Sequence, residues 1–393
     1  MRTQVGIVGA GPAGLMLSHL LHLRGVDSVV IDLQTRETIE QTIKAGILEQ
    51  GTVDLLRQTG LGDRMMRDGF VHHGINLAFE GGLHRINLTE LSGGRSVMVY
   101  AQHEVLKDLI AKRLADGADI RFGVTDTQVA GLQSEQPTIT FQHEGQQHSL
   151  ECDFIIGADG SRTYTRFQIP QPEVRTDFFR QYPFAWFGIL AEAPPSSDEL
   201  IYAHSERGFV LVSTRSPSVQ RLYFQCDPET KVDDWSDDRI WSEFEARLSP
   251  SGASVTTGNI FKKDVLQFRS FVCEPMQYGR LFLAGDSAHT VPPTGAKGLN
   301  LAMADVHVLD RALGAYYQSK DTGLLQSYTD TALRRVWRAQ WFSFWMTSML
   351  HRFSDATDFD LRRQVAELEL VTSSTTAAKT LADNYTGLPD RKS

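Results

Sequence analysis

The sequence predicts an α/β protein in which a Rossmann-like nucleotide-binding domain is interleaved with a mostly antiparallel β-sheet domain and followed by a helical C-terminal region. Three observations support this fold class. A glycine-rich turn between an apolar strand and a helix lies within the first 32 residues. Alternating, aromatic-rich segments that are typical of antiparallel strands separate the apolar runs. Helical spacing dominates after Leu299.

The first unit of the chain has the complete order of a dinucleotide-binding motif. The apolar run Val5–Val8 leads into a turn with Gly9, Gly11 and Gly14, and a second apolar run ends at Asp32, 18 residues after Gly14. In such motifs the glycines permit a tight turn, close approach of a pyrophosphate and close helix packing, and the acid binds a ribose hydroxyl. An ordinary tight turn is the alternative, but the full order favours a dinucleotide.

Size and composition narrow the class of protein. The chain has 393 residues, is 41% apolar and carries a net charge of -9, which suits two or three packed domains and argues against general affinity for nucleic acid or anionic lipid. No apolar run approaches the roughly 18 residues of a membrane span, and no cleavable signal is expected. Three scattered cysteines fit neither a disulfide framework nor a metal site. We therefore expect a cytoplasmic protein that binds a small molecule, without a metal.

The other elements follow from local periodicity, taken in chain order. After Asp32 we expect a loop or short helix, and then a helix from Ile43 to Leu56. Strands of a second sheet are expected from Gly69 to Val99, and a helix from Gln102 to Ala115. Further strands and turns are expected at 120–122, 138–141, 148–152, 154–160, 184–271 and 279–298, before the C-terminal helices.

These elements predict discontinuous domains. The nucleotide-binding domain comprises residues 1–71, 98–180 and 270–300, the β-sheet domain comprises 72–97 and 181–269, and the helical region comprises 301–393. In the helical region, Trp337, Trp341 and Trp345 recur at i, i+4 spacing and form one stripe. Core packing is the favoured interpretation of this stripe, and a dimer contact is the lesser one.

A hairpin in the second domain carries polar side chains on one face. In the segment 209–215 the odd positions share a face, so Ser213 and Arg215 point the same way as two apolar side chains. After a Ser-Pro-Ser turn, Arg221 and Tyr223 alternate in the same manner. A guanidinium on an apolar face needs an anion. The anion is either an acidic side chain of the protein, which is the favoured interpretation for an isolated arginine, or the carboxylate of a ligand.

Several motifs together resemble those of the single-component flavoprotein aromatic hydroxylases, over essentially the whole chain. They are the glycine fingerprint, Asp159-Gly160, Gly285-Asp286, the segment 292–300 and Tyr385. The resemblance implies FAD as cofactor and NADPH or NADH as cosubstrate. The residues that it implies for FAD binding are Gly9, Gly11, Gly14, Asp32, Lys44, Gln102, Asp159, Arg221, Asp286, Gly298, Leu299 and Asn300. For Asp286 the alternative is a helix N-cap.

The resemblance also implies a reaction in aromatic catabolism, the hydroxylation of 4-hydroxybenzoate to 3,4-dihydroxybenzoate by dioxygen through a flavin C4a-hydroperoxide. The substrate-binding residues would be Ser213, Arg215, Tyr223, Tyr202, Pro293 and Thr294. A phenol with a pKa of about 10 must lose its proton before it reacts. The resemblance assigns catalysis to Tyr202, Tyr385 and His72 as a proton relay and to Pro293, whose carbonyl points inward. Trp186 would close the pocket.

The nicotinamide cofactor has no second glycine fingerprint, so we expect it to bind across a surface groove. The residues considered for it are Gln34, Arg36, Lys44, Arg162 and Arg269. The segment 33–44 carries two glutamates and few cations, whereas a 2′-phosphate prefers arginine. We therefore expect a weaker preference for NADPH than in NADPH-using relatives, with NADH or dual use.

A homodimer is expected, and two alternatives for the function stay open. The first is a related hydroxylase that acts on another carboxylated phenol. The second is a non-catalytic flavin-binding sensor, which would keep the fold and lose the chemistry.

Overall fold

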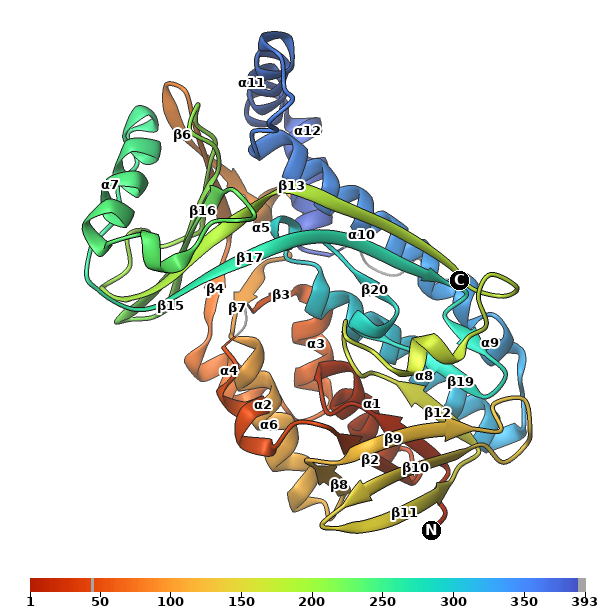
Figure 1. Ribbon diagram of the computed structural model, residues 1–393. Helices are drawn as coiled ribbons and strands as arrows, with labels where there is room; N and C mark the ends of the chain where they lie inside the picture. The colour runs from red at the N-terminus through yellow and green to blue at the C-terminus, as the bar shows by residue number, and fades with distance from the viewer. Residues whose placement is uncertain (44–45, 388–393) are drawn as a thin grey trace.

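The computed structural model describes residues 1–43 and 46–387, and its first layer is a six-stranded sheet that contains the glycine-rich unit (Figure 1). The strand order is β18-β19-β12-β1-β2-β8, and all neighbours are parallel except β18 and β19. The strands are β1 (Val5–Val8), β2 (Ser28–Asp32), β8 (Asp119–Phe122), β12 (Phe154–Gly157), β18 (Gln277–Tyr278) and β19 (Leu281–Leu283). The carboxyl ends of β1, β2 and β12 share one edge, where open α/β sheets bind their ligands.

This sheet is covered on both faces, and every residue of β1 is therefore buried. One cover is formed by the helices α1 (Pro12–Leu23), α6 (Gln102–Ala115) and α8 (Gly298–Ser319). The other is a three-stranded antiparallel sheet of β9 (Thr125–Ala130), β10 (Thr138–His143) and β11 (Gln146–Glu151), drawn near the N-terminus in Figure 1. A Cβ on Gly6 would lie 2.6 Å from Ile139 Cδ1, so β10 packs directly on β1.

An eight-stranded sheet forms the second layer, and it is antiparallel except where β14 pairs with β5. The order is β20-β17-β13-β16-β15-β14-β5-β6. Its strands are β5 (Gly74–Phe79), β6 (Gly82–Asn87), β13 (Thr176–Glu192), β14 (Ile201–Ala203), β15 (Val210–Ser216), β16 (Val219–Cys226), β17 (Asn259–Glu274) and β20 (His289–Thr290). The predicted fold class is confirmed. The predicted domain boundaries at 180 and 269 fall inside the long strands β13 and β17, and that division of the chain stays a prediction.

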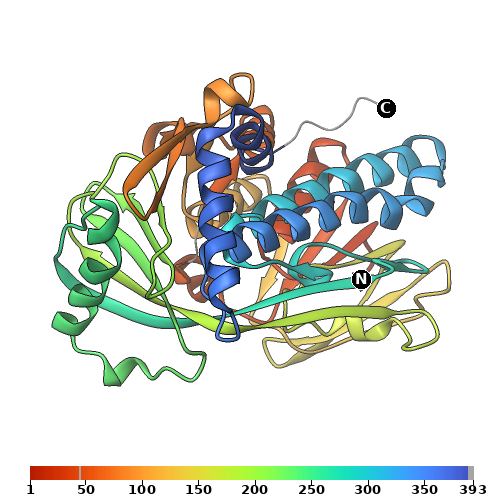
Figure 2. The ribbon, with the colours of Figure 1, turned by 90° about the horizontal axis from the view of Figure 1, so that it is seen from above.

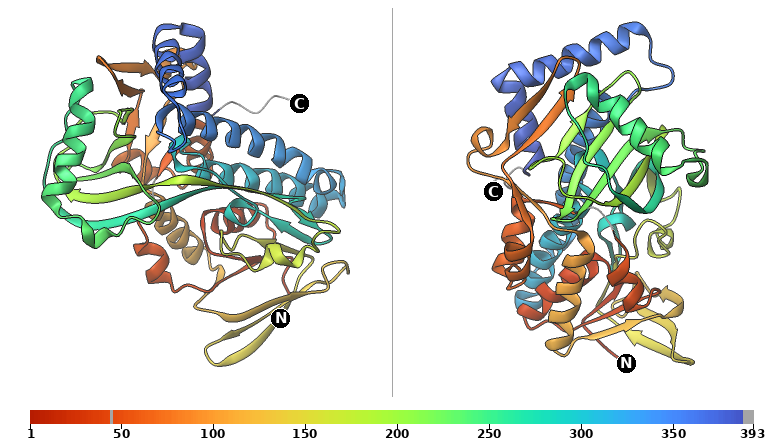
Figure 3. Two further views of the ribbon diagram at one scale, coloured as in Figure 1. Left: turned by 45° about the horizontal axis from the view of Figure 1, so that its top comes forward. Right: turned by 90° about the vertical axis from the view of Figure 1, so that its left-hand side faces the viewer.

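The two faces of the eight-stranded sheet carry alternate residues of the hairpin β15–β16. Val210 and Val212 belong to a core with α7 (Asp237–Leu248), which covers the outer face in Figure 3. Phe209 and Leu211 belong to a second core, which includes side chains of the C-terminal helices. The helices that follow α8 are α9 (Gly323–Gln326), α10 (Tyr328–Leu350), α11 (Asp358–Ser373) and α12 (Thr375–Tyr385). Figure 2 shows α8 and α10 side by side, with α11 crossing them. The predicted alternation is confirmed for residues 209–212, whereas the register shifts between Thr214 and Ser216, and the predicted face of Arg215 stays a prediction.

Local periodicity was misleading around Gly46. The predicted helix from Ile43 to Leu56 is wrong over Ile47–Glu49, which forms β3, and is confirmed from Gln50 onward, where α3 (Gln50–Gln58) begins. β3 pairs with β7 (Val97–Val99), which also pairs with β4 (Phe70–His72). A Cβ on Gly46 would lie 2.0 Å from the Tyr100 carbonyl oxygen, so this pairing requires glycine there. The tertiary contact decides the local structure.

Some other elements were not expected, and one interpretation is overturned. β9 and α7 were not expected, nor were the short helices α4 (Asp63–Asp68) and α5 (Leu88–Leu91), whereas α2 (Arg36–Gln41) lies where a loop or a short helix was expected. Trp337 and Trp341 are 42% and 50% exposed, so core packing is wrong for them. None of the helices within 1–43 and 46–387 combines the length and apolar character needed to cross a membrane.

Candidate functional site

A cavity of about 580 Å³ opens at the carboxyl edge of the parallel sheet, where the predicted FAD residues gather. The predicted residues that line it are Gly9, Gly11, Asp32, Gln102, Asp159, Asp286, Gly298 and Leu299. They come from β1, β2, β12, the turn after β19 and the starts of α1, α6 and α8. Lys44 lies outside the described residues.

The glycines and helix ends of this cavity fit a dinucleotide pyrophosphate. Gly9 has φ +115°, and a Cβ there would lie 2.2 Å from the Ala158 carbonyl oxygen. A Cβ on Gly14 would lie 1.9 Å from the Gly9 carbonyl oxygen, so Gly14 serves close packing beneath the cavity. α1 and α8 both begin at the cavity without a side-chain cap, which leaves their first N–H groups available to an anion. The site therefore fits the diphosphate of FAD.

The acidic side chains around the cavity differ in how much of their hydrogen-bonding capacity the protein itself uses. Asp32 accepts one hydrogen bond on each oxygen, from the Ala10 N–H at 2.6 Å and the Gln34 N–H at 2.7 Å, and burial raises its pKa. Lone pairs remain for a ribose hydroxyl. Asp159 instead accepts four bonds from residues 163–165, which means that its carboxylate shapes its own turn. Asp286 is exposed to the cavity and caps no helix, because α8 begins at Gly298.

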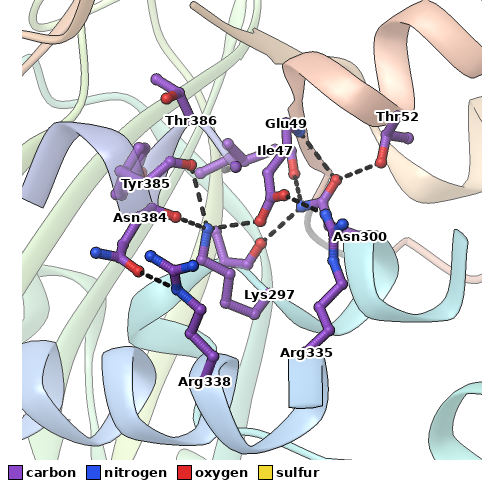
Figure 4. Close-up of polar contacts among 12 residues, drawn as sticks. Ile47, Glu49, Thr52, Lys297, Asn300, Arg335, Arg338, Asn384, Tyr385 and Thr386 are labelled. Carbon is purple, nitrogen blue, oxygen red and sulfur yellow. Dashed lines mark hydrogen bonds and ion pairs between the residues drawn. The ribbon is translucent and has the colours of Figure 1, made fainter. Parts of the chain in front are cut away.

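The side-chain amide of Asn300 forms its hydrogen bonds with other groups of the protein (Figure 4). Its Oδ1 accepts from the Glu49 N–H at 2.9 Å and from Thr52 Oγ1 at 2.8 Å. Its Nδ2 donates to the carbonyls of Ile47 and Ala296, both at 2.9 Å. The amide has no capacity left, so a role for Asn300 at FAD is limited to its backbone N–H. The side chain ties β3 to the turn before α8.

Lys297 and Glu49 form a buried ion pair that the sequence analysis missed. Lys297 Nζ lies 2.6 Å from Glu49 Oε1, and it donates to the carbonyl oxygens of Asn384 and Tyr385 as well (Figure 4). Burial lowers the pKa of Lys297, and Glu49 acts in the opposite direction. A lysine in a turn of glycine, proline and small apolar residues was the available signal, since such a charge needs a buried partner.

The predicted substrate residues lie on adjacent strands. Leu211 pairs with Tyr223 and Ser213 pairs with Arg221, and the Ser213 hydroxyl donates to the Arg221 carbonyl at 2.7 Å. Arg215 forms no ion pair within the described part of the chain, and its Nε is buried without a hydrogen-bond partner. Burial lowers the pKa of Arg215 to about 10. Its guanidinium therefore lacks a counter-ion.

Among the described residues Arg221, unlike Arg215, has an acidic side chain of the protein as its partner. Its Nη2 lies 3.1 Å from Asp264 Oδ2, and its Nη1 donates to the Ile43 carbonyl at 3.4 Å. The interpretation of a structural ion pair thus holds for Arg221 and fails for Arg215. Arg221 does not line the FAD cavity, and its predicted contact with FAD stays a prediction.

The predicted proton relay is partly assembled. The Tyr202 and Tyr385 hydroxyl oxygens are 2.7 Å apart and buried, and burial raises the pKa of both phenols. His72 ends β4, and burial lowers its pKa. Its Nδ1 is buried without a hydrogen-bond partner. Among the described residues no direct hydrogen bond joins His72 to the tyrosine pair, and its relay role stays a prediction.

Trp186 and the turn 293–295 lie at this aromatic core. Trp186 is 1% exposed and packs against Tyr223, with ring centroids 4.8 Å apart. Pro293 and Thr294 belong to a short 3-10 helix, and Thr294 Oγ1 lies within hydrogen-bond distance of Thr347 Oγ1, at 3.0 Å. Thr347 was not singled out from the sequence, because its position on α10 gives no sign of what it faces.

The described residues considered for the nicotinamide cofactor, Gln34, Arg36, Arg162 and Arg269, are exposed. Gln34 and Arg162 line the rim of the FAD cavity, and Arg269 lies on β17. Arg36 Nε donates to Glu40 Oε1 at 2.7 Å, so its charge is already paired.

Comparisons with known proteins agree with this geometry. The family model described as FAD binding domain matches residues 2–343. The chain is 43% identical to p-hydroxybenzoate hydroxylase of Acinetobacter baylyi over 99% of this chain and 96% of that protein. It is 26% identical to 3-(3-hydroxy-phenyl)propionate/3-hydroxycinnamic acid hydroxylase 2 of Burkholderia vietnamiensis, over 83% of this chain and 59% of that one. The crystal structure of p-nitrophenol 4-monooxygenase from Pseudomonas putida superimposes with a TM-score of 0.82 at 17% identity and covers 99% of both chains.

Proposed function

The chain belongs to the FAD-dependent aromatic hydroxylases, and we propose that it hydroxylates 4-hydroxybenzoate next to its phenol to give 3,4-dihydroxybenzoate. The observation that carries the choice of substrate is the guanidinium of Arg215, which has no acid partner among the described residues and lies on the same sheet as Tyr202. A molecule with a carboxylate at one end and a phenol at the other complements this arrangement.

Arg215 binds the carboxylate end in this proposal. A buried guanidinium without a counter-ion is unfavourable, and a carboxylate can accept two parallel hydrogen bonds from its planar fork. Tyr223 adds a hydroxyl group from the same hairpin, whereas Ser213, whose hydroxyl donates to the Arg221 carbonyl at 2.7 Å, would have to release that bond to donate to the carboxylate. The uncompensated charge of Arg215 therefore makes the site specific for an aromatic acid.

Tyr202 and Tyr385 act on the phenol end. Both remain protonated at neutral pH because burial raises their pKa, so each hydroxyl can accept one hydrogen bond and donate another. The substrate phenol donates to Tyr202, Tyr202 donates to Tyr385, and in this proposal intervening water carries the proton on to the unpartnered Nδ1 of His72. Burial lowers the pKa of His72, which keeps its ring neutral and able to accept.

FAD, held by the cavity residues, supplies the hydride acceptance and the activation of dioxygen. The protein orients the substrate against it. Pro293 and Thr294 present backbone groups beside the predicted flavin position, and Thr347 fixes Thr294 from α10. The buried aromatic side chains around Trp186 and Tyr223 exclude water from the reacting ring.

NADPH or NADH reduces the flavin, and we propose that the two are used with similar efficiency. Arg162, Arg269 and Gln34 are exposed and available to a nucleotide, whereas Arg36 is paired with Glu40. With Arg36 neutralised and Glu37 next to it, the segment offers little attraction for a 2′-phosphate.

The protein is proposed to be a homodimer through an aromatic surface on β13 and α10. This surface comprises Phe178, Phe179, Trp337, Trp341 and Phe344, which are between 37% and 62% exposed. The rings of Phe178 and Trp337 are in edge contact at 5.4 Å, so the two elements form one patch. Exposed aromatic side chains at this density are typical of protein interfaces.

A cytoplasmic location is proposed from the cysteines. Cys152, Cys226 and Cys273 are unpaired, and an aromatic hydroxylase also needs the cell's nicotinamide cofactors. Recovery of the protein outside the cytoplasm after cell fractionation would contradict this.

Replacing Arg215 with alanine is expected to weaken 4-hydroxybenzoate binding by about 3 kcal/mol, because the carboxylate loses a desolvated partner. Titration of the FAD absorbance with substrate measures this. Arg85→Ala is the matched control, since Arg85 is paired with Glu199 at 2.7 Å on the same sheet. If Arg215→Ala binds the acid normally, the substrate assignment is wrong. Product identification on the wild type then separates 4-hydroxybenzoate from another carboxylated phenol, and lack of NAD(P)H oxidation would indicate a sensor.

Replacing Tyr202 with phenylalanine is expected to slow hydroxylation by about 100-fold, the order of a general acid–base contribution. Flavin reduction continues, so hydrogen peroxide is released instead of product. The ratio of product to NAD(P)H consumed is the measurement. Tyr182→Phe is the control, because Tyr182 is a buried tyrosine whose hydroxyl bonds Ser270 instead. An undiminished ratio in Tyr202→Phe would remove Tyr202 from the relay.

The kcat/KM values for NADPH and NADH are expected to lie within about tenfold of each other, because the paired Arg36 leaves no strong site for the 2′-phosphate. Glu40→Gln frees Arg36 and should shift the ratio toward NADPH by about threefold, the scale of an exposed ion pair. Glu144→Gln, in the exposed turn between β10 and β11, should leave it unchanged. A wild-type NADPH advantage of 100-fold would contradict the charge argument.

Sedimentation velocity at micromolar concentration is expected to give a dimer, and Trp341→Lys should shift it toward monomer because a charge is placed in the aromatic surface. Leu33→Lys changes another exposed apolar residue and serves as the control. A wild-type monomer at these concentrations would rule out the dimer.

A further inference from the structure

A buried histidine lies beside the proposed substrate pocket and belongs to none of the groups described above. His351 follows the last residue of α10 and is 0% exposed. Its Nε2 lies 2.7 Å from Trp186 Nε1, and its Nδ1 lies 3.0 Å from the Thr347 carbonyl oxygen. Both ring nitrogens are therefore in hydrogen-bond contact, one with Trp186 on strand β13 and the other with Thr347 on helix α10.

The chemistry of the two partners fixes the proton on the ring. An indole N–H can only donate, so His351 Nε2 must accept from Trp186. A backbone carbonyl can only accept, so Nδ1 must carry the proton and donate to Thr347. His351 is thus neutral with a single tautomer, and burial lowers its pKa to about 3, which keeps it neutral in the working pH range.

Stacked rings hold the imidazole in place. Phe209 lies 4.4 Å and Phe184 4.7 Å from the His351 ring, with interplanar angles of 28° and 11°. Trp186 stacks on Phe209 at 5.0 Å and contacts Tyr223 on another side at 4.8 Å. The indole of Trp186 therefore joins the histidine to the hairpin that carries Arg215.

The same turn of α10 also reaches the opposite side of the site. The Thr347 carbonyl accepts from His351, while the Thr347 hydroxyl donates to the Ser343 carbonyl at 2.7 Å and can accept from Thr294 Oγ1, which lies 3.0 Å away. Thr347 and His351 are one helical turn apart, so a rigid element holds both Trp186 and the turn 293–295. Loss of the Trp186–His351 bond would leave Trp186 without this support, and loss of the Thr347–Thr294 contact would leave the turn 293–295 without it.

From this arrangement we propose that His351 is a positioning residue for hydroxylation: as hydrogen-bond acceptor for Trp186, it fixes the indole against Tyr223 and so sets the shape of the aromatic side of the substrate pocket. This rests on the proposed function, since the pocket is defined by 4-hydroxybenzoate. The role requires an acceptor at the Nε2 position and no charge. His351 itself touches neither the substrate nor the reacting atoms in this scheme.

Two substitutions separate the acceptor from the packing. His351→Phe keeps an aromatic ring for the stack and removes the acceptor, whereas His351→Gln places an amide oxygen where Nε2 was. We expect the dissociation constant for 4-hydroxybenzoate to rise about fivefold to tenfold in His351→Phe, the scale of one net hydrogen bond, and to stay within about twofold in His351→Gln. The product yield per NAD(P)H should fall in the first variant and recover in the second.

The indole N–H resonance of Trp186 reports the bond without any substrate. The protein contains six tryptophans, and Trp186→Phe identifies the resonance in a ¹⁵N-labelled, FAD-loaded sample. The signal should lie downfield in the wild type and in His351→Gln, and move upfield in His351→Phe. An unmoved resonance in His351→Phe, or normal substrate affinity despite the shift, would overturn the positioning role.

Failure of the positioning role of His351 can be distinguished from failure of the proposed function. If the wild type does not convert 4-hydroxybenzoate, the function is wrong, while the resonance still tests the Trp186–His351 bond. If His351→Phe fails to fold, Trp186→Phe removes the same bond from the donor side and keeps a ring in the stack. It should weaken substrate binding by a similar factor, and unchanged binding there would contradict the proposal.

Discussion

The structure depends on a buried ion pair, Lys297 with Glu49, at the point where three distant segments of the chain meet. Glu49 ends β3, Lys297 precedes α8, and the carbonyls of Asn384 and Tyr385 end α12. Breaking such a pair leaves an uncompensated buried charge, at a cost of about 3–5 kcal/mol. The turn 293–298, the strand below it and the last helix must therefore stay together, and this brings Tyr385 to Tyr202.

Pairing within the protein separates the structural charges of this site from those that are open to ligands. Lys297 and Arg221 have acids of the protein as partners, and both hold segments together. Arg215 on the same sheet as Arg221 has none among the described residues. The acids around the cavity follow the same division, because Asp159 is occupied by its own turn and Asp286 is not. A polar group that the fold leaves unsatisfied, in a place where it could have been satisfied, is the strongest physical sign of a ligand.

Much of the fold and part of the site could be predicted because their signals are local. The glycine turn has its meaning within a few residues, since Gly9 has φ +115° and a Cβ on Gly14 would lie 1.9 Å from the Gly9 carbonyl oxygen. The alternation of the hairpin at residues 209–212 could be predicted for the same reason. Other features have no local signal. Ile47–Glu49 has helical periodicity, yet pairing with β7 makes it a strand. Trp337 and Trp341 share a helical face that the fold leaves exposed.

The sequence by itself determined the dinucleotide site, the fold class and the presence of a cation on an apolar strand, because these follow from steric limits and from the periods of strands and helices. Only the tertiary structure decided which polar groups remain available. Asn300 and Asp159 belong to recognisable motifs, but their hydrogen-bonding capacity is used inside the protein. His351 belongs to no motif and is joined to Trp186 across 165 residues of sequence. Such contacts depend on the packing of whole elements, and no pattern of neighbouring residues encodes them.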